Sequence, residues 1–325
     1  MQIADMHCDT ISRLYDETVQ GSAEGLRANR GHLDLERMKN SGYLLQNFAL
    51  FVHLKKDGDP WSRICCLYDF YQKELQKNQD LIAPMHCFAD YEKNREEGKL
   101  SALLTVEEGG VCKGEIGKLR KLYEMGVRMM TLTWNYPNEL GFPNRERDSV
   151  NPVLAGGLTE CGKAFVEEME RLGMIPDVSH LSDEGFYDVL ETTKKPFVAS
   201  HSDARALCSH ARNLTDEMIK KLAVRGGVMG LNYYTEFLGM SAGDISMEAF
   251  VKQARHISNV GGVEVLGLGS DFDGIDTNPA LPGAESMVKL WDALKKGGFT
   301  ERELDLIFAD NVLRVYREVL CNGDS

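Results

Sequence analysis

The chain has 325 residues, of which 43% are hydrophobic and 27% are charged, a composition typical of a globular protein with a large core. Its formal net charge of −13 argues against nucleic acid and anionic membrane surfaces as partners. No apolar stretch reaches the roughly 20 residues of a membrane span, and no secretion signal is recognisable at the N-terminus. The eight cysteines are scattered without a C-x-x-C motif, which argues against a disulfide scaffold and favours a reducing, cytoplasmic location.

A repeating unit runs along the chain: a short apolar segment rich in strand-forming residues, a polar loop and then a helical pattern. Eight apolar segments are near-continuous rather than alternating, as expected for parallel strands covered on both faces. They are residues 2–9, 43–51, 101–107, 127–134, 174–180, 196–201, 227–233 and 263–271.

Helix signals separate these segments. Residues 116–126 and 162–173 each end in a glycine suited to a helix C-cap. Hydroxyl residues that precede acidic residues predict further N-caps at Ser182, Thr215 and Thr300. Helices and strands are therefore expected to alternate along the chain.

Eight strands alternating with helices predict an α/β fold of the (β/α)8 TIM barrel type. We expect one barrel domain over residues 1–325, with a longer helical insertion around residues 52–100. A doubly wound open sheet is the alternative, but it usually has fewer strands and often a glycine-rich first turn, which this sequence lacks.

The first predicted strand ends in His7-Cys8-Asp9. Residues i and i+2 of a strand point to one face, so His7 and Asp9 aim at the same spot. Imidazole and carboxylate together suit zinc, although a buried histidine bonded to a neighbouring aspartate is the commoner interpretation of such a pair alone.

Other predicted strands end in similar groups. Barrel enzymes place their catalytic residues at the carboxyl ends of strands. The third, fifth, sixth and eighth segments end in or run directly into Glu107-Glu108, His180, His201 and Asp271-Phe272-Asp273. Three of the eight histidines thus stand at predicted strand ends, which favours a metal site over a polar core network.

The number of ligands suggests two metal ions. His7 and Asp9 would hold one ion, His180 and His201 the other, and a carboxylate after the third segment would bridge them. Asp271 is then surplus to ligation and suited to general acid–base catalysis, although Asp273 could take its place on sequence alone.

The chain resembles the membrane (renal) dipeptidase family of binuclear zinc peptidases, which are metallo-dependent hydrolases of the amidohydrolase type. The resemblance spans nearly the whole chain in family order and is specific as a set. It rests on His7-Cys8-Asp9, Val106-Glu107-Glu108-Gly109-Gly110, Leu119…Tyr123…Gly126-Val127-Arg128…Leu132-Thr133, Asp177-Val178-Ser179-His180, Ser200-His201-Ser202, Ala211-Arg212-Asn213 and Gly269-Ser270-Asp271-Phe272-Asp273-Gly274.

This resemblance implies a dipeptidase with two Zn²⁺ ions per chain, in which a metal-bridging hydroxide attacks the peptide bond of a dipeptide. It also implies a homodimer. The residues carried over are His7 and Asp9 on one zinc, His180 and His201 on the other, Glu107 as the bridge, Asp271 as acid and base, and Arg212 for the substrate's terminal carboxylate. Glu108 is the alternative bridge, because the family has Glu-Gly here; ungapped counting selects Glu107.

One departure from the family concerns the segment after the fourth predicted strand. The renal enzymes have a histidine there, where this chain has Trp134 followed by Asn135. An indole N–H donates a hydrogen bond but carries no positive charge. Trp134 or Asn135 replaces the contact with substrate, or the metals suffice, or the substrate range differs. Asn232, Tyr233 and Tyr234, at the end of the seventh segment, are further expected substrate contacts, and Tyr233 is the one selected for the site.

Two other functions stay open. One is a binuclear barrel hydrolase that acts on another amide, a lactam or an N-acyl amino acid. The other is a metal-stabilised binding protein without catalysis, for which Trp134 is the hint.

Overall fold

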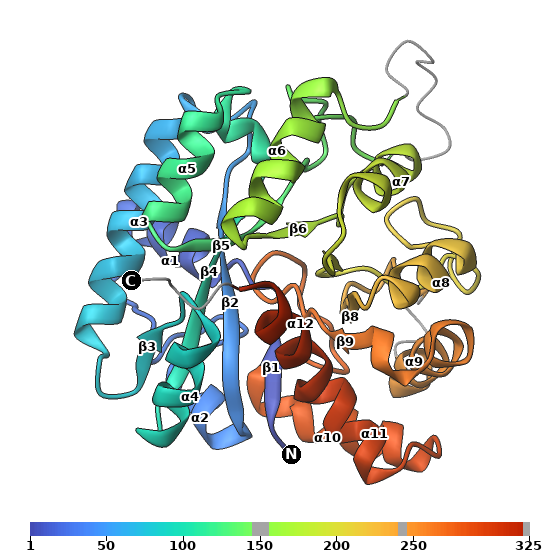
Figure 1. The fold of residues 1–325 in the computed structure, drawn as a ribbon. Helices are drawn as coiled ribbons and strands as arrows, with labels where there is room; N and C mark the ends of the chain where they lie inside the picture. Colours follow the sequence, from blue (N-terminus) through green and yellow to red (C-terminus); the bar gives the residue numbers. More distant parts are fainter. Residues whose placement is uncertain (145–155, 240–245, 321–325) are drawn as a thin grey trace.

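The structure, a computed structural model, describes residues 1–144, 156–239 and 246–320 (Figure 1). Within these residues eight parallel strands close into a barrel, and helices between the strands surround it. The barrel strands are β1 (Ile3–Asp5), β2 (Tyr43–Phe51), β4 (Leu100–Glu107), β5 (Val127–Thr131), β6 (Ile175–Asp177), β7 (Val198–Ala199), β8 (Val228–Leu231) and β9 (Leu266–Leu268). The predicted (β/α)8 TIM barrel is therefore confirmed.

The barrel closes through the pairing of β2 with β4, which runs in register from Leu45 opposite Ser101 to Phe51 opposite Glu107. One additional strand, β3 (Ile82–Pro84), pairs with the beginning of β4. The connection between β2 and β4 contains β3 and two helices, α3 (Pro60–Lys77) and α4 (Phe88–Glu96).

The helices bury their apolar faces against the strands, as amphipathic helices on a parallel sheet must. Besides α3 and α4, the described helices are α1 (Thr10–Val19), α2 (Leu35–Ser41), α5 (Ile116–Glu124), α6 (Glu160–Leu172), α7 (Asp183–Thr192), α8 (Asp216–Val224), α9 (Met247–Gly261), α10 (Met287–Lys296), α11 (Glu301–Asp305) and α12 (Asn311–Val319). The predicted caps at Ser182, Thr215 and Thr300 are present, since each hydroxyl accepts a backbone N–H of the first turn.

The barrel interior is closed at the end where the strands begin. A buried apolar cluster joins residues of seven barrel strands to the apolar face of α12, including Val312 and Tyr316. Because successive strand residues face opposite sides, a second and larger cluster fills the layer between strands and helices. The first apolar cluster does not extend to the opposite end of the barrel, where the strands end and polar side chains lie.

The predicted strands extend too far at their carboxyl ends. His7, His180, His201 and Asp271 all lie two or more residues beyond the last paired residue of their strands. His180 and Asp271 have φ angles of 67° and 61°, in the left-handed region that side chains other than glycine seldom adopt. These residues leave the hydrogen-bonded ladder and so turn over the mouth of the barrel.

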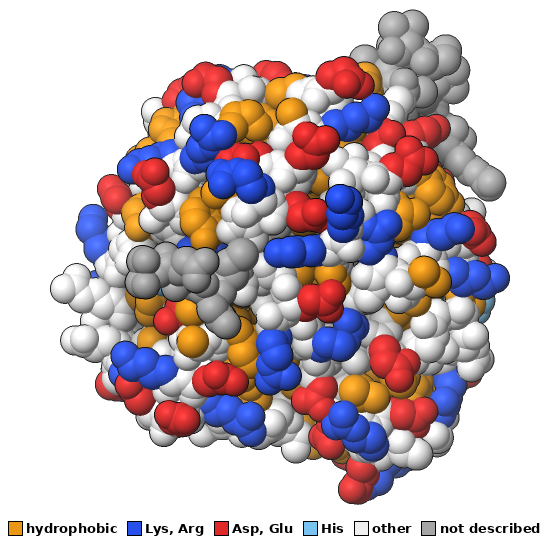
Figure 2. Space-filling model, viewed as in Figure 1, with side chains coloured by type: hydrophobic (Ala, Val, Ile, Leu, Met, Phe, Trp, Pro, Cys, Tyr) orange, Lys and Arg blue, Asp and Glu red, His pale blue; other side chains and the backbone are white. Residues whose placement is uncertain are grey.

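The surface carries charged side chains of both signs. Acidic and basic groups are interspersed over the face in Figure 2, and hydrophobic side chains appear in small separate patches. None of the helices in the described part of the chain is long and apolar enough to cross a membrane.

Candidate active site

A cavity of about 590 Å³ opens at the carboxyl ends of the barrel strands. Because parallel strands end on the same side, residues far apart in the sequence meet there. Its lining includes Asp9, Glu107, Trp134, Asn135, His180, Arg212, Tyr234, Phe237 and Asp271.

Backbone contacts continue beyond β1 and β9 and align the segments that follow these strands. The amide of Asp271 donates to the carbonyl of His7 at 3.2 Å, and the amide of Asp9 donates to that of Phe272 at 2.8 Å. Below them, the buried Asp5 carboxylate accepts the amides of His7 and Ser270. The side chains of His7, Asp9 and Asp271 are thereby held on one side of the barrel mouth.

The imidazole of His7 lies among three carboxylates. Its Nε2 is 3.4 Å from Asp9 Oδ2, 3.4 Å from Glu107 Oε2 and 3.8 Å from Asp271 Oδ1. The ring is buried, and neither of its nitrogens has a hydrogen-bond partner among the described residues. A buried ring nitrogen without a partner, surrounded by oxygen ligands, is what a metal site requires.

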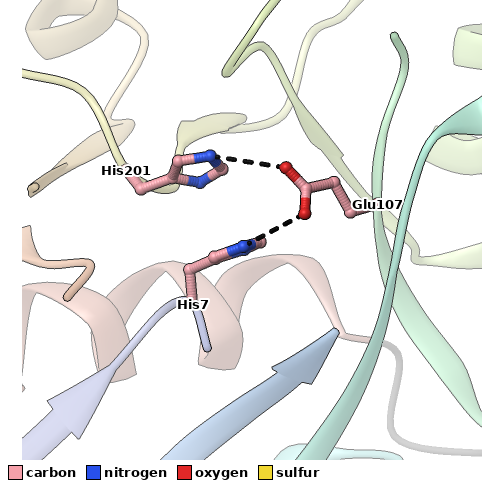
Figure 3. Close-up of side chains that lie close together, drawn as sticks. All are labelled: His7, Glu107 and His201. Atoms are coloured by element: carbon pink, nitrogen blue, oxygen red, sulfur yellow. Dashed lines mark ion pairs between the residues drawn. The ribbon is translucent and has the colours of Figure 1, made fainter. Parts of the chain in front are cut away.

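The other oxygen of Glu107 faces a pair of histidines. Its Oε1 lies 3.1 Å from His180 Nε2 and 3.6 Å from His201 Nε2. Figure 3 shows the Glu107 carboxylate between His7 and His201, with one oxygen turned to each ring. The structure thus places Glu107 in the position between the two groups of potential ligands.

The hydrogen bonds behind the two rings determine their tautomers. Ser200 donates its hydroxyl proton to Asp177 at 2.6 Å, so its oxygen accepts from His201 Nδ1 at 2.7 Å. Asn135 Oδ1, which can only accept, lies 2.8 Å from His180 Nδ1. Both rings therefore carry their proton on Nδ1, and both Nε2 lone pairs point into the site.

These two lone pairs face each other at a distance of 3.1 Å. Burial lowers the pKa of His180 and of His201 well below the ordinary histidine value, and the charges of Arg212 and His7 lower both further. Two neutral imidazoles with opposed lone pairs beside a carboxylate repel one another unless a cation lies between them. This donor set therefore fits a metal ion.

The crowded carboxylates point to the same conclusion. Burial raises the pKa of Glu107 to about 7, and the nearby Asp9 and Asp271 raise it as well. Burial likewise raises the pKa of Asp271. Burial alone would lower the pKa of His7, but Glu107 and Asp9 outweigh it and hold that pKa well above its ordinary value. Bound cations would allow the carboxylates of Asp9, Glu107 and Asp271 to be negatively charged together.

Arg212 reaches the cavity from the segment between β7 and α8. It is buried, with Nη1 3.4 Å from Ser202 Oγ and Nη2 3.2 Å from the carbonyl of His201. Its Nε has no hydrogen-bond partner among the residues that the structure describes, and the guanidinium lies 5.2 Å from the ring centre of Phe237. A buried guanidinium with unused donors is suited to bind a carboxylate.

The end of β8 contributes one of the two tyrosines expected there. Tyr233 does not enter the cavity: it is fully buried, with its hydroxyl 3.6 Å from Met287 Sδ. Of the residues expected to contact substrate here, Tyr234 lines the cavity, so the selection of Tyr233 is wrong on position. The reason is a turn in which Asn232 Oδ1 accepts the amide of Tyr234 at 2.6 Å, ending the strand alternation.

Asn232, also expected to contact substrate, lies against the carboxylate of Asp271. Its Nδ2 donates to Asp271 Oδ2 at 3.0 Å, which holds that carboxylate while Oδ1 faces His7. Its position at the end of the seventh predicted strand was the available signal.

Glu108 turns away from the cavity. Its φ is 103°, and its buried carboxylate accepts the amides of Gly110 at 2.8 Å and Trp134 at 3.1 Å. Trp134 lines the cavity, with its ring centre 5.0 Å from that of Phe51 and 6.2 Å from that of His180. The geometry therefore separates Glu107 from Glu108, which the sequence left open.

Known proteins are similar to this chain over most of its length. The family profile described as membrane dipeptidase (peptidase family M19) matches residues 1–323. An uncharacterised dipeptidase of Schizosaccharomyces pombe is 32% identical over 289 residues, which cover 86% of this chain and 66% of that protein. Dipeptidase aclJ of Aspergillus oryzae is 31% identical over 304 residues, which cover 89% of this chain and 70% of that protein. The chain thus spans about two thirds of the length of these curated relatives.

Solved structures share the fold. A metallopeptidase of Rhodobacter sphaeroides, crystallised with a phosphinate mimic of the dipeptide L-Ala-D-Ala, superposes with a TM-score of 0.89 at 24% identity. The superposition covers 98% of this chain and 99% of that one. From the match over residues 1–323, the chain belongs to the membrane dipeptidase family, peptidase family M19.

Proposed function

We propose that this protein is a metal-dependent dipeptidase that holds two zinc ions and hydrolyses the peptide bond of dipeptides. The observation that carries the proposal is the position of Glu107, with one carboxylate oxygen near His7 and the other near His180 and His201. Membership of the membrane dipeptidase family supports it, as does the dipeptide mimic bound to the Rhodobacter sphaeroides metallopeptidase.

We assign the proposed ligands to two groups. His7 and Asp9 would hold one ion and His180 and His201 the other, with Glu107 shared between them. Two zinc ions bound in this way supply a water-derived nucleophile at neutral pH and polarise the scissile carbonyl.

Asp271 would move the proton. Its Oδ1 faces the site near His7, while Asn232 holds Oδ2, so the carboxylate has one free oxygen of fixed direction. This oxygen would take the proton of the attacking water and pass it to the leaving amine. Arg212 would bind the terminal carboxylate of the substrate through its planar N–H groups, which sets the distance from that carboxylate to the scissile bond.

The aromatic residues Trp134 and Tyr234, with Asn135, line the same cavity and are proposed to contact the bound substrate. The cytoplasmic location and the homodimer stay predictions. Hydrolysis of N-acyl amino acids or lactams is the alternative for the same cavity, because both present an amide bond, and N-acyl amino acids also present a carboxylate.

Metal removal tests the proposal. Protein treated with a chelator and dialysed is expected to lose hydrolysis of a dipeptide panel and to regain it with about two equivalents of zinc per chain, since the nucleophile depends on the ions. Product amino acids and zinc content are measured on the same samples. A panel with free and N-acylated amines separates the dipeptidase from the alternative, and a zinc-loaded protein inactive on every dipeptide would refute the proposal.

Asp271→Asn is expected to lower kcat about 100- to 10,000-fold while both zinc ions stay bound, because general acid–base catalysis is removed and the proposed ligands are intact. Steady-state kinetics and elemental analysis check the two parts. Asp273→Asn is the matched control: the Asp273 carboxylate accepts from Thr10 and pairs with Arg13, outside the ligand groups. If Asp273→Asn lost more kcat than Asp271→Asn, the assignment would be reversed.

A further inference from the structure

The segment after β5 brings a side-chain amide against one of the proposed metal ligands. Asn135 Oδ1 lies 2.8 Å from His180 Nδ1, on the side of the ring opposite Glu107. His201 is supported differently, by Ser200 and the buried Asp177 behind it. The two histidines of one ligand group thus depend on separate supports, and that of His180 comes from a cavity-lining residue.

Glu108 holds this segment in place. The fully buried carboxylate accepts the amide of Trp134, the residue before Asn135, and also the side-chain amide of Asn138 at 2.5 Å. Asn138 in turn donates to the carbonyl of Leu132 at 2.9 Å and accepts the amide of Leu140 at 2.7 Å. The loop is therefore fixed on both sides of Asn135 by one carboxylate–amide pair.

The backbone of Glu108 explains how it reaches the loop. Its φ of 103° directs the side chain behind the loop, while the preceding Glu107 enters the cavity at the end of β4. Of these two adjacent glutamates, Glu107 lines the cavity and Glu108 accepts hydrogen bonds from the loop.

We propose that Asn135 is a positioning residue that fixes the tautomer and orientation of His180, and that Glu108 sets the place of Asn135. A neutral imidazole whose Nδ1–H lacks an acceptor can turn, or move its proton to Nε2, and in either case the lone pair aimed at the site is lost. Partners of this kind contribute about 10- to 100-fold to metal affinity. The inference rests on the proposed zinc centre and gives Asn135 a role that does not require contact with substrate.

The first test measures zinc affinity, by competition of the apo protein with a chromophoric chelator. Asn135→Ala is expected to lower the affinity for one of the two zinc ions about 10- to 100-fold and to leave the affinity for the other unchanged. Asn135→Asp keeps an acceptor oxygen and is expected to restore the affinity. Asn278→Ala is the matched control, because its side-chain amide donates to the carbonyl of Tyr233 and to none of the proposed ligands.

The second test couples Glu108 to Asn135. Glu108→Gly removes the carboxylate, and glycine adopts the positive φ without strain. This variant is expected to lower the affinity for the same zinc ion as Asn135→Ala does. The double variant should then bind zinc as well as the more affected of the two single variants, because both substitutions remove the same contact. Glu108→Gln, which keeps one acceptor oxygen, should lose less than about tenfold and serves where the glycine variant does not fold.

The outcomes are distinct from those of the proposed function. If the unsubstituted protein binds no zinc, the proposed function fails. If it binds two zinc ions and Asn135→Ala binds both equally well, water replaces the amide and the inference is wrong. Additive losses for Glu108→Gly and Asn135→Ala would overturn the role of Glu108.

Discussion

Glu107→Gln is expected to lower kcat/KM for dipeptides by more than about 1,000-fold, which is roughly 4 kcal/mol of transition-state stabilisation. A carboxamide has one oxygen, so it cannot serve the His7 group and the His180–His201 group together. Bound zinc should fall below two ions per chain. Kinetics at saturating zinc, with elemental analysis of the dialysed protein, measure both effects.

The control is the neighbouring residue. Glu108→Gln removes the same charge from a buried side chain whose donors among the described residues are Gly110, Trp134 and Asn138, and it should keep both zinc ions at saturating metal. If Glu108→Gln were the inactive variant and Glu107→Gln kept both ions, the bridge would have been assigned to the wrong glutamate.

Arg212→Met is expected to raise KM and to lower kcat/KM for dipeptides about 30- to 4,000-fold. Truncating one partner of a buried charge pair costs about 2–5 kcal/mol, and each 1.4 kcal/mol is tenfold. Burial lowers the pKa of this guanidinium, with Asp271 and Glu107 opposing the change, and arginine stays charged in proteins. Arg212→Lys keeps a point charge without the planar fork and should recover only part of the loss.

Dipeptides with a C-terminal amide, which lack the terminal carboxylate, distinguish a loss of carboxylate binding from a general loss of activity. The unsubstituted protein should prefer a dipeptide to its C-terminal amide, and Arg212→Met should abolish that preference with zinc content unchanged. An equal loss on both substrates would instead assign Arg212 to support of the segment around Ser202 and His201.

Strand number and barrel type were predictable because buried parallel strands read as continuous apolar segments. The positions at which the strands end were not predictable, because the pattern of residue types that predicts each strand continues past its last paired residue. His180 belongs to the pattern by sequence, yet the paired strand ends at Asp177 and the chain then turns. The small strand β3, three residues long and ending in Pro84, has no periodicity to recognise.

Site residues next to a strand end were predictable as types but not always as positions. Tyr233 and Tyr234 both stand at the end of the seventh segment, and the turn formed by Asn232 is what places Tyr234 in the cavity lining and leaves Tyr233 buried. Glu107 and Glu108 differ through a backbone angle of 103° that no spacing rule foresees. The hydrogen bonds that orient the histidines, such as that of Ser200 to Asp177, could not be predicted without the tertiary contacts.

The seam between β1 and β9 has a consequence for how the protein is made. These strands share a single paired position, Asp5 opposite Leu268, yet the segments after them carry His7 and Asp271. Ser270 donates to the carbonyl of His7 across 263 residues of sequence. Such a distant pairing closes a loop that contains most of the chain, which costs conformational entropy. A growing chain on the ribosome therefore has no complete reaction centre until its last barrel strand has emerged, and the proposed peptidase chemistry cannot begin before that point.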